Sequence, residues 1–164
     1  MTRLTTLNFS NPLGQSFGIM RVLFALIPIL AGFDKFFNYL VDWPKYLAPW
    51  APNLFNQALH TVTPQTVTPQ QFMYGVGMVE IVVGVLVALW PAVFAYVVMV
   101  WLWGIIANLV SLGHYDIAVR DFGLSIGSLA LARLAWAHHL ELRGRGVAGV
   151  TASERMEARG RAAA

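Results

Sequence analysis

Four long apolar stretches, separated by polar segments, dominate the chain, at residues 17–41, 72–90, 92–112 and 117–137. Each is close to the ~20 residues that an α-helix needs to cross a bilayer. The pattern therefore predicts an all-α fold, a membrane four-helix bundle that is antiparallel, with a long outward loop between helices 1 and 2. Within that loop, residues 53–60 are expected to form a short surface helix.

The polar segments divide the chain into three parts. Residues 1–16 form a polar N-terminal segment, residues 17–138 the four-transmembrane-helix domain, and residues 139–164 a charged cytoplasmic tail. We expect the tail to be partly disordered or to form a short surface helix.

Helix boundary signals support these divisions. Thr68 is expected to be an N-cap, with Pro69 in the first turn and Gln71 completing a capping box. Gly113 is expected to end the third helix, and Asp116 to cap the fourth.

Composition agrees with a membrane protein. The chain is 57% hydrophobic and only 12% charged, whereas soluble domains carry about 25% charged residues. It has no cysteine, which excludes a disulfide framework, a CxxC redox pair and cysteine-bound iron–sulfur clusters. We also expect no metal site, no haem and no nucleic-acid partner, since no matching motif accompanies the net charge of +3.

Basic residues gather at one predicted side of the membrane. The positive-inside rule places that side, and with it both termini, in the cytoplasm. The basic residues of the tail are Arg143, Arg145, Arg155, Arg159 and Arg161.

Five charged residues lie in or just inside the predicted spans at a common depth: Asp34, Lys35, Glu80, Arg120 and Asp121. A charge at the bilayer centre costs at least ~2.5–3.5 kcal/mol, so such residues face the protein interior and find partners. Lys35, Glu80 and Asp121 all fall in the outer third, and we take them as the catalytic candidates. The two carboxylates, Glu80 and Asp121, could accept and release protons during a reaction.

Further polar residues could contact a substrate near this layer. We take Arg120, His114, Asn108 and Arg21 as substrate-binding candidates, although Arg21 lies near the inner end of the first helix. A purely structural role is the alternative, because buried ion pairs can simply fix helix register. Tryptophans are assigned structural roles, Trp43 at the lipid headgroups and Trp101 in packing or lipid contact.

Short motifs resemble the DoxX/DoxD-like membrane proteins. They are RVL at 21–23 followed by AGFDKF at 31–36, MVE at 78–80 followed by a glycine, and HYDIAVRDFGLSIGSLALARLA at 114–135. The resemblance covers roughly residues 17–137. It implies a four-helix membrane bundle. Some members of that family are subunits of a membrane thiosulfate:quinone oxidoreductase, which makes quinone a possible cofactor and a redox subunit a possible partner. We expect the chain in the cell (inner) membrane of a bacterium or archaeon, with a homo-oligomer as a possible assembly. The matching residues are Arg21, Lys35, Glu80, His114 and Asp121.

Three functions remain open on this basis. The first is a quinone-linked redox subunit, related to thiosulfate or oxidative-stress chemistry, in which a small oxyanion could also meet the cationic residues from outside. The second is a non-enzymatic membrane scaffold or accessory protein. The third is a small-solute or proton carrier. The residues do not decide whether the chain is an enzyme.

Overall fold

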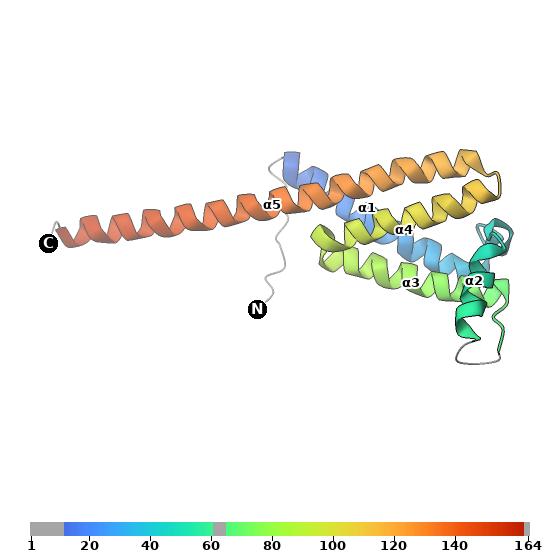
Figure 1. Cartoon of the computed structure of the whole chain (residues 1–164). Coiled ribbons are helices and arrows are strands. Elements are labelled where there is room, and N and C mark those ends of the chain that lie inside the picture. The colour runs from blue at the N-terminus through green and yellow to red at the C-terminus, as the bar shows by residue number, and fades with distance from the viewer. Residues whose placement is uncertain (1–11, 61–64, 163–164) are drawn as a thin grey trace.

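The computed structural model describes residues 12–60 and 65–162, with side chains up to residue 140, and in these residues it contains helices and no strand. Figure 1 shows the long helices lying side by side, with the shorter elements gathered at one end. The elements are α1 (Pro12–Phe37), the 3-10 helix η1 (Trp43–Tyr46), α2 (Trp50–Leu59), α3 (Pro69–Leu89), α4 (Pro91–Ser111) and α5 (Tyr115–Ala162). We call the end that carries η1 and α2 the loop end, and the end with the α3–α4 connection at Trp90 the turn end.

The long helices pack most closely in two pairs, α1 with α3 and α4 with α5. Glycines bring α1 and α3 together: a Cβ added to Gly32 would lie 2.6 Å from the Gly77 carbonyl oxygen. Small residues permit this kind of close backbone approach in membrane helices. The two pairs join through a buried apolar cluster that includes Phe24, Val87 and Leu131.

Local sequence explains where the helices begin and end. Thr68 is the N-cap of α3, and the capping box with Gln71 is confirmed. Pro91 begins α4 after a connection of one residue, Trp90. After α4, Gly113 adopts a positive φ of 79°, which glycine tolerates without strain. Asp116 lies in the first turn of α5 instead of capping it, because α5 begins at Tyr115.

Three predicted boundaries differ from the structure, the first being the end of α1, which lies at Phe37 instead of at residue 41. Helix α1 begins at Pro12, inside the predicted polar N-terminal segment, of which residues 1–11 lie outside the described residues. Helix α5 continues to Ala162, where we expected partial disorder or a separate short helix. No proline stands between 115 and 162, so α5 meets no proline break at the membrane boundary. The short surface helix expected at 53–60 is present as α2.

Helices α1, α3 and α4 are each long and apolar enough to cross a membrane. Large apolar side chains are exposed along them, among them Leu30, Val82 and Val100. An exposed apolar surface of this kind needs lipid as its solvent. The chain is therefore a multi-pass membrane protein.

Candidate functional site

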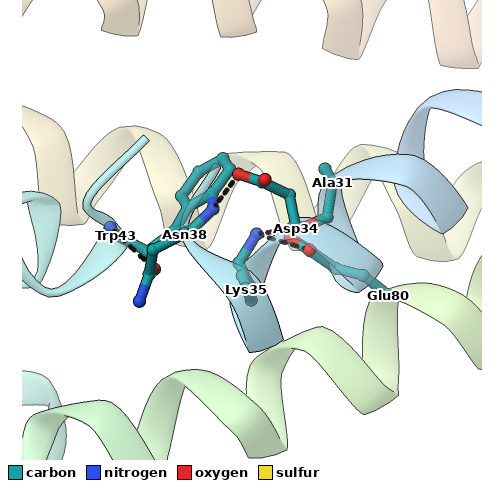
Figure 2. A network of polar contacts seen from close by, with 6 residues as sticks. All are labelled: Ala31, Asp34, Lys35, Asn38, Trp43 and Glu80. Atoms are coloured by element: carbon teal, nitrogen blue, oxygen red, sulfur yellow. Dashed lines mark hydrogen bonds and ion pairs between the residues drawn. The ribbon is translucent and has the colours of Figure 1, made fainter. Parts of the chain in front are cut away.

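Lys35 and Glu80 form a buried ion pair across the α1–α3 contact. The Lys35 Nζ lies 2.5 Å from the Glu80 Oε2, and the two side chains are only 4% and 8% exposed. Gly77, one turn before Glu80 on α3, lets the backbone of α1 approach closely enough for this contact. The pair joins two of the three catalytic candidates from helices that are distant in sequence (Figure 2).

The aromatic ring of Trp43 covers the ammonium group of Lys35. The Nζ lies 3.7 Å from the ring centroid, which is within the range of a cation–π interaction. The Nζ also makes a longer contact of 3.5 Å to the Ala31 carbonyl in its own helix. Lys35 is thus surrounded by a carboxylate, a carbonyl and an aromatic face.

Asp34 holds Trp43 in this position. Its Oδ2 accepts a hydrogen bond of 2.8 Å from the Trp43 indole Nε1, and its Oδ1 accepts from the backbone amides of Tyr39 and Leu40 at 3.0 Å each. Asn38 ends the helix with a positive φ of 53°, a conformation that asparagine adopts more readily than most residues. Two adjacent residues of α1 therefore contact the same indole: Asp34 accepts its N–H, and Lys35 lies against its ring face (Figure 2).

Residues 38–49 connect α1 to α2 and contain Trp43, and we call this segment the strap. Its later part contacts α4. Asn108 fixes its far part: the Nδ2 donates to the Tyr46 carbonyl at 2.6 Å, and the Oδ1 accepts from the Ala48 amide at 2.8 Å. The His114 ring lies 5.0 Å from the Tyr46 ring. Asn108 and His114 thus contact the strap, and neither is hydrogen-bonded to Lys35 or Glu80.

Asp121 lies in the same region but pairs within its own helix. It is buried, and its Oδ1 accepts from the Arg120 guanidinium at 2.8 Å. It is near enough to Glu80 for the two carboxylates to interact electrostatically. The Arg120 side chain is 65% exposed. We expected charges from three helices to contact one another. In the structure only Lys35 and Glu80 form a direct pair between helices, and Asp121 is a second carboxylate nearby.

Trp101 of α4 approaches Glu80 from another side. Its Nε1 is buried and has no partner within hydrogen-bond distance among the described residues, although it is close enough to Glu80 to interact with the carboxylate. Trp101 also lines an apolar groove of about 440 Å³ on α4. The residues lining the groove are Tyr96, Val97, Val100, Trp101 and Gly104.

Arg21 lies apart from this site. Its guanidinium donates two hydrogen bonds to the Ala88 carbonyl, the one from Nε measuring 2.9 Å. Ala88 belongs to the last turn of α3, where helix carbonyls lose their intrahelical partners. In this structure Arg21 caps α3 at the turn end, some 14 residues or about 21 Å along α1 from Lys35.

Two tryptophans at the site were not among the candidates. Trp43 was assigned to the lipid headgroups and Trp101 to packing or lipid contact, yet both lie against the ion pair. The aspartate before Lys35 was a usable signal for Trp43, because a buried carboxylate needs donors and an indole N–H is one. Nothing in the sequence marks Trp101, since α4 has no charged residue and its apolar pattern has no break at this position.

The arrangement has defined chemical capacities. Glu80 and Asp121 are buried carboxylates that can hold or release a proton, and Lys35 donates a hydrogen bond to Glu80. No family model, curated protein or solved structure matches this chain.

Proposed function

We propose that this chain is a DoxX-like membrane subunit of a quinone-linked redox system. In this proposal α5 is the fourth span, both termini are cytoplasmic, and the loop end faces outward from the inner membrane of a bacterium or archaeon. A partner redox subunit would supply electrons, and a homo-oligomer is compatible with it.

One observation carries the proposal: Trp101 lines the apolar groove on α4 and also lies close to the buried carboxylate of Glu80. A quinone has an apolar chain that suits such a groove and two carbonyls that accept hydrogen bonds. The unpartnered Nε1 of Trp101 is a donor of the kind that those carbonyls need. The residues present therefore fit the group.

Each residue has a role in this proposal. A bound quinone would supply a two-electron, two-proton acceptor. Glu80 would hold and deliver a proton, with Lys35 fixing the orientation of its carboxylate. Asp121 would be the next proton-holding group, with the exposed side chain of Arg120 paired to it.

The test is quinone reduction by the purified protein with its partner. Glu80→Gln keeps the shape and removes the proton, and the expected loss is at least 10²-fold in rate, as for a general acid or base. Asp116→Asn, an exposed carboxylate on the same side, is the matched control and should leave the rate unchanged. Background levels of extracted quinone, together with an unaffected Glu80→Gln variant, would refute the proposal.

A scaffold function is the second candidate, and the closed network around Lys35 favours it. The ammonium group contacts Glu80, Trp43 and Ala31, and Asp34 is bound by three N–H groups. Such a network needs no ligand. The double variant Lys35→Met/Glu80→Leu would then keep cellular function, whereas Lys35→Met alone should lose about 3–5 kcal/mol of stability by leaving Glu80 buried and unpaired.

A further inference from the structure

We propose that the Lys35–Glu80 pair is sealed from the water at the loop end and is reached from the bilayer, past Trp101. Its ligand is then a membrane-soluble molecule with a hydrogen-bonding head, and a water-soluble anion does not bind at Lys35. This route of access rests on the proposed function, because both involve the Lys35–Glu80 pair.

The water side of the pair is closed by bonded groups. The Trp43 ring lies over the Lys35 ammonium, and the charged Asp34 holds that ring through its indole N–H (Figure 2). To admit an anion to Lys35, Trp43 must leave, which breaks a cation–π contact and a hydrogen bond to a carboxylate together.

The strap resists this movement on both sides of Trp43. Before it, the amides of Tyr39 and Leu40 donate to Asp34. After it, Asn108 of α4 binds the backbone of Tyr46 and Ala48. Beyond the strap, the Trp50 Nε1 donates to the Ser111 Oγ at 3.0 Å. Because Trp43 lies between fixed points, it cannot swing out without loosening the chain around it.

An anion would gain little at Lys35 in return. The Nζ already lies 2.5 Å from the Glu80 carboxylate. A second anion would have to displace that carboxylate, or share the ammonium with it at the cost of like-charge repulsion. An accessible cation exists elsewhere, in the exposed side chain of Arg120.

On the bilayer side, Trp101 of α4 lies beside Glu80. Trp101 lines the α4 groove and also approaches Glu80, and its Nε1 has no partner within hydrogen-bond distance. A rotation of this ring loses only its contact with Glu80, which is longer than a hydrogen bond. Gly104, one turn further along α4, has open space around it and widens the groove beside Trp101. Of the two routes to Glu80, the one from lipid meets the weaker barrier.

The lysine content of the chain supplies a direct test. Its only lysines are Lys35 and Lys45. Lys45 is exposed on the strap, and Lys35 lies beneath the strap. A membrane-impermeant acylating reagent, applied at the loop end to protein in lipid vesicles, should label Lys45 and spare Lys35, with each site read by peptide mass.

Variants of the seal should change this pattern. Trp43→Ala and Asp34→Asn should raise Lys35 labelling at least ten-fold, while Trp43→Phe, which keeps an aromatic face, should raise it less than Trp43→Ala. Lys45 labelling is the internal control in every sample, and α-helical circular dichroism identifies variants that fail to fold. Equal labelling of both lysines in the wild-type protein, or a folded Trp43→Ala variant that still spares Lys35, would overturn the seal.

The bilayer route is tested by filling the groove. A benzoquinone with a ten-carbon chain should bind the wild-type protein and bind Gly104→Leu at least ten-fold more weakly. Gly123→Leu is the matched control, because Gly123 on α5 also has open space around it. Equal binding to both variants would overturn entry past Trp101. No binding to the wild-type protein would overturn the proposed function and the choice of ligand, whereas the lysine pattern would still decide the seal.

Discussion

Gly32 and Gly77 face each other across α1 and α3, and a Cβ on either would lie 2.6 Å from the carbonyl oxygen of the other. The nearest atoms are backbone atoms of the facing helix, so an added methyl group can be accommodated only by separating the helices. We expect Gly32→Ala or Gly77→Ala to lose about 1–3 kcal/mol, the usual cost of overpacking. Thermal unfolding in detergent would measure this as a lower midpoint.

Gly75→Ala provides the control on the same helix. Gly75 is exposed and has no atom within 4 Å of an added Cβ. Alanine is favoured over glycine in a helix by roughly 1 kcal/mol, so this variant should be as stable as the wild type or slightly more so. Equal midpoints for Gly75→Ala and Gly77→Ala would mean that the close contact is absent in the membrane.

Removing the Arg21 side chain should weaken the turn end. Arg21 satisfies the Ala88 carbonyl in the last turn of α3, and hydrogen bonds from charged groups contribute about 1.5–3 kcal/mol. Arg21→Met should lower the thermal midpoint accordingly. The matching change at Arg133, an exposed arginine of α5, should have little effect, and quinone reduction by Arg21→Met should fall only as far as its folded fraction does.

His138 is expected to reduce the stability of the fold. It is 3% exposed and stacked 4.9 Å from the Phe17 ring, and neither ring nitrogen has a partner among the residues whose side chains the structure describes. A buried polar group without partners costs about 1–3 kcal/mol, so His138→Phe should raise the thermal midpoint while keeping the stacked contact. His139→Phe, at an exposed position next to it, should not. A loss of stability in His138→Phe would show that its nitrogens are satisfied in the membrane.

Lys45 should respond to pH through Asp42. Its Nζ lies 2.9 Å from the Asp42 Oδ2, and the hydrogen bond to Asp42 raises the pKa of Lys45 above its usual value. Acylation requires the neutral amine, so Asp42→Asn should lower this pKa and move the pH profile of Lys45 labelling to lower pH. Asp116→Asn should leave the profile unchanged. A profile unaffected by Asp42→Asn would show that the pair does not persist in solution.

The energetic cost of burying charge allowed two residues of the site, Lys35 and Glu80, to be predicted from the sequence. Both side chains were expected to face the protein interior and to have charged partners, and in the structure they pair with each other. The same reasoning placed Asp121 nearby but overstated its role in a shared cluster, because Arg120 next to it in the chain is its partner. Helix boundaries at Thr68 and Pro91 followed from local rules.

The strap could not be predicted in the same way. It is not periodic, so neither helical spacing nor strand alternation indicates where Trp43 points. Asn108 and His114 were recognised as polar residues near the right end, but their partners are backbone and ring atoms of the strap. Arg21 shares a helical face with Lys35 in sequence, yet its partner is a carbonyl at the opposite end. Such contacts depend on tertiary structure alone.

The close pairing of α1 with α3 also has a consequence for biosynthesis. The ribosome makes α1 first, and the whole strap and α2 must follow before α3 exists. Until then Lys35 has no Glu80, and an unpaired ammonium is costly in lipid. Lys35 therefore adds about 2.5–3.5 kcal/mol to the cost of inserting α1 by itself. That cost falls when α3 follows and supplies the carboxylate of Glu80, so the second helix to be made helps to hold the first in the bilayer.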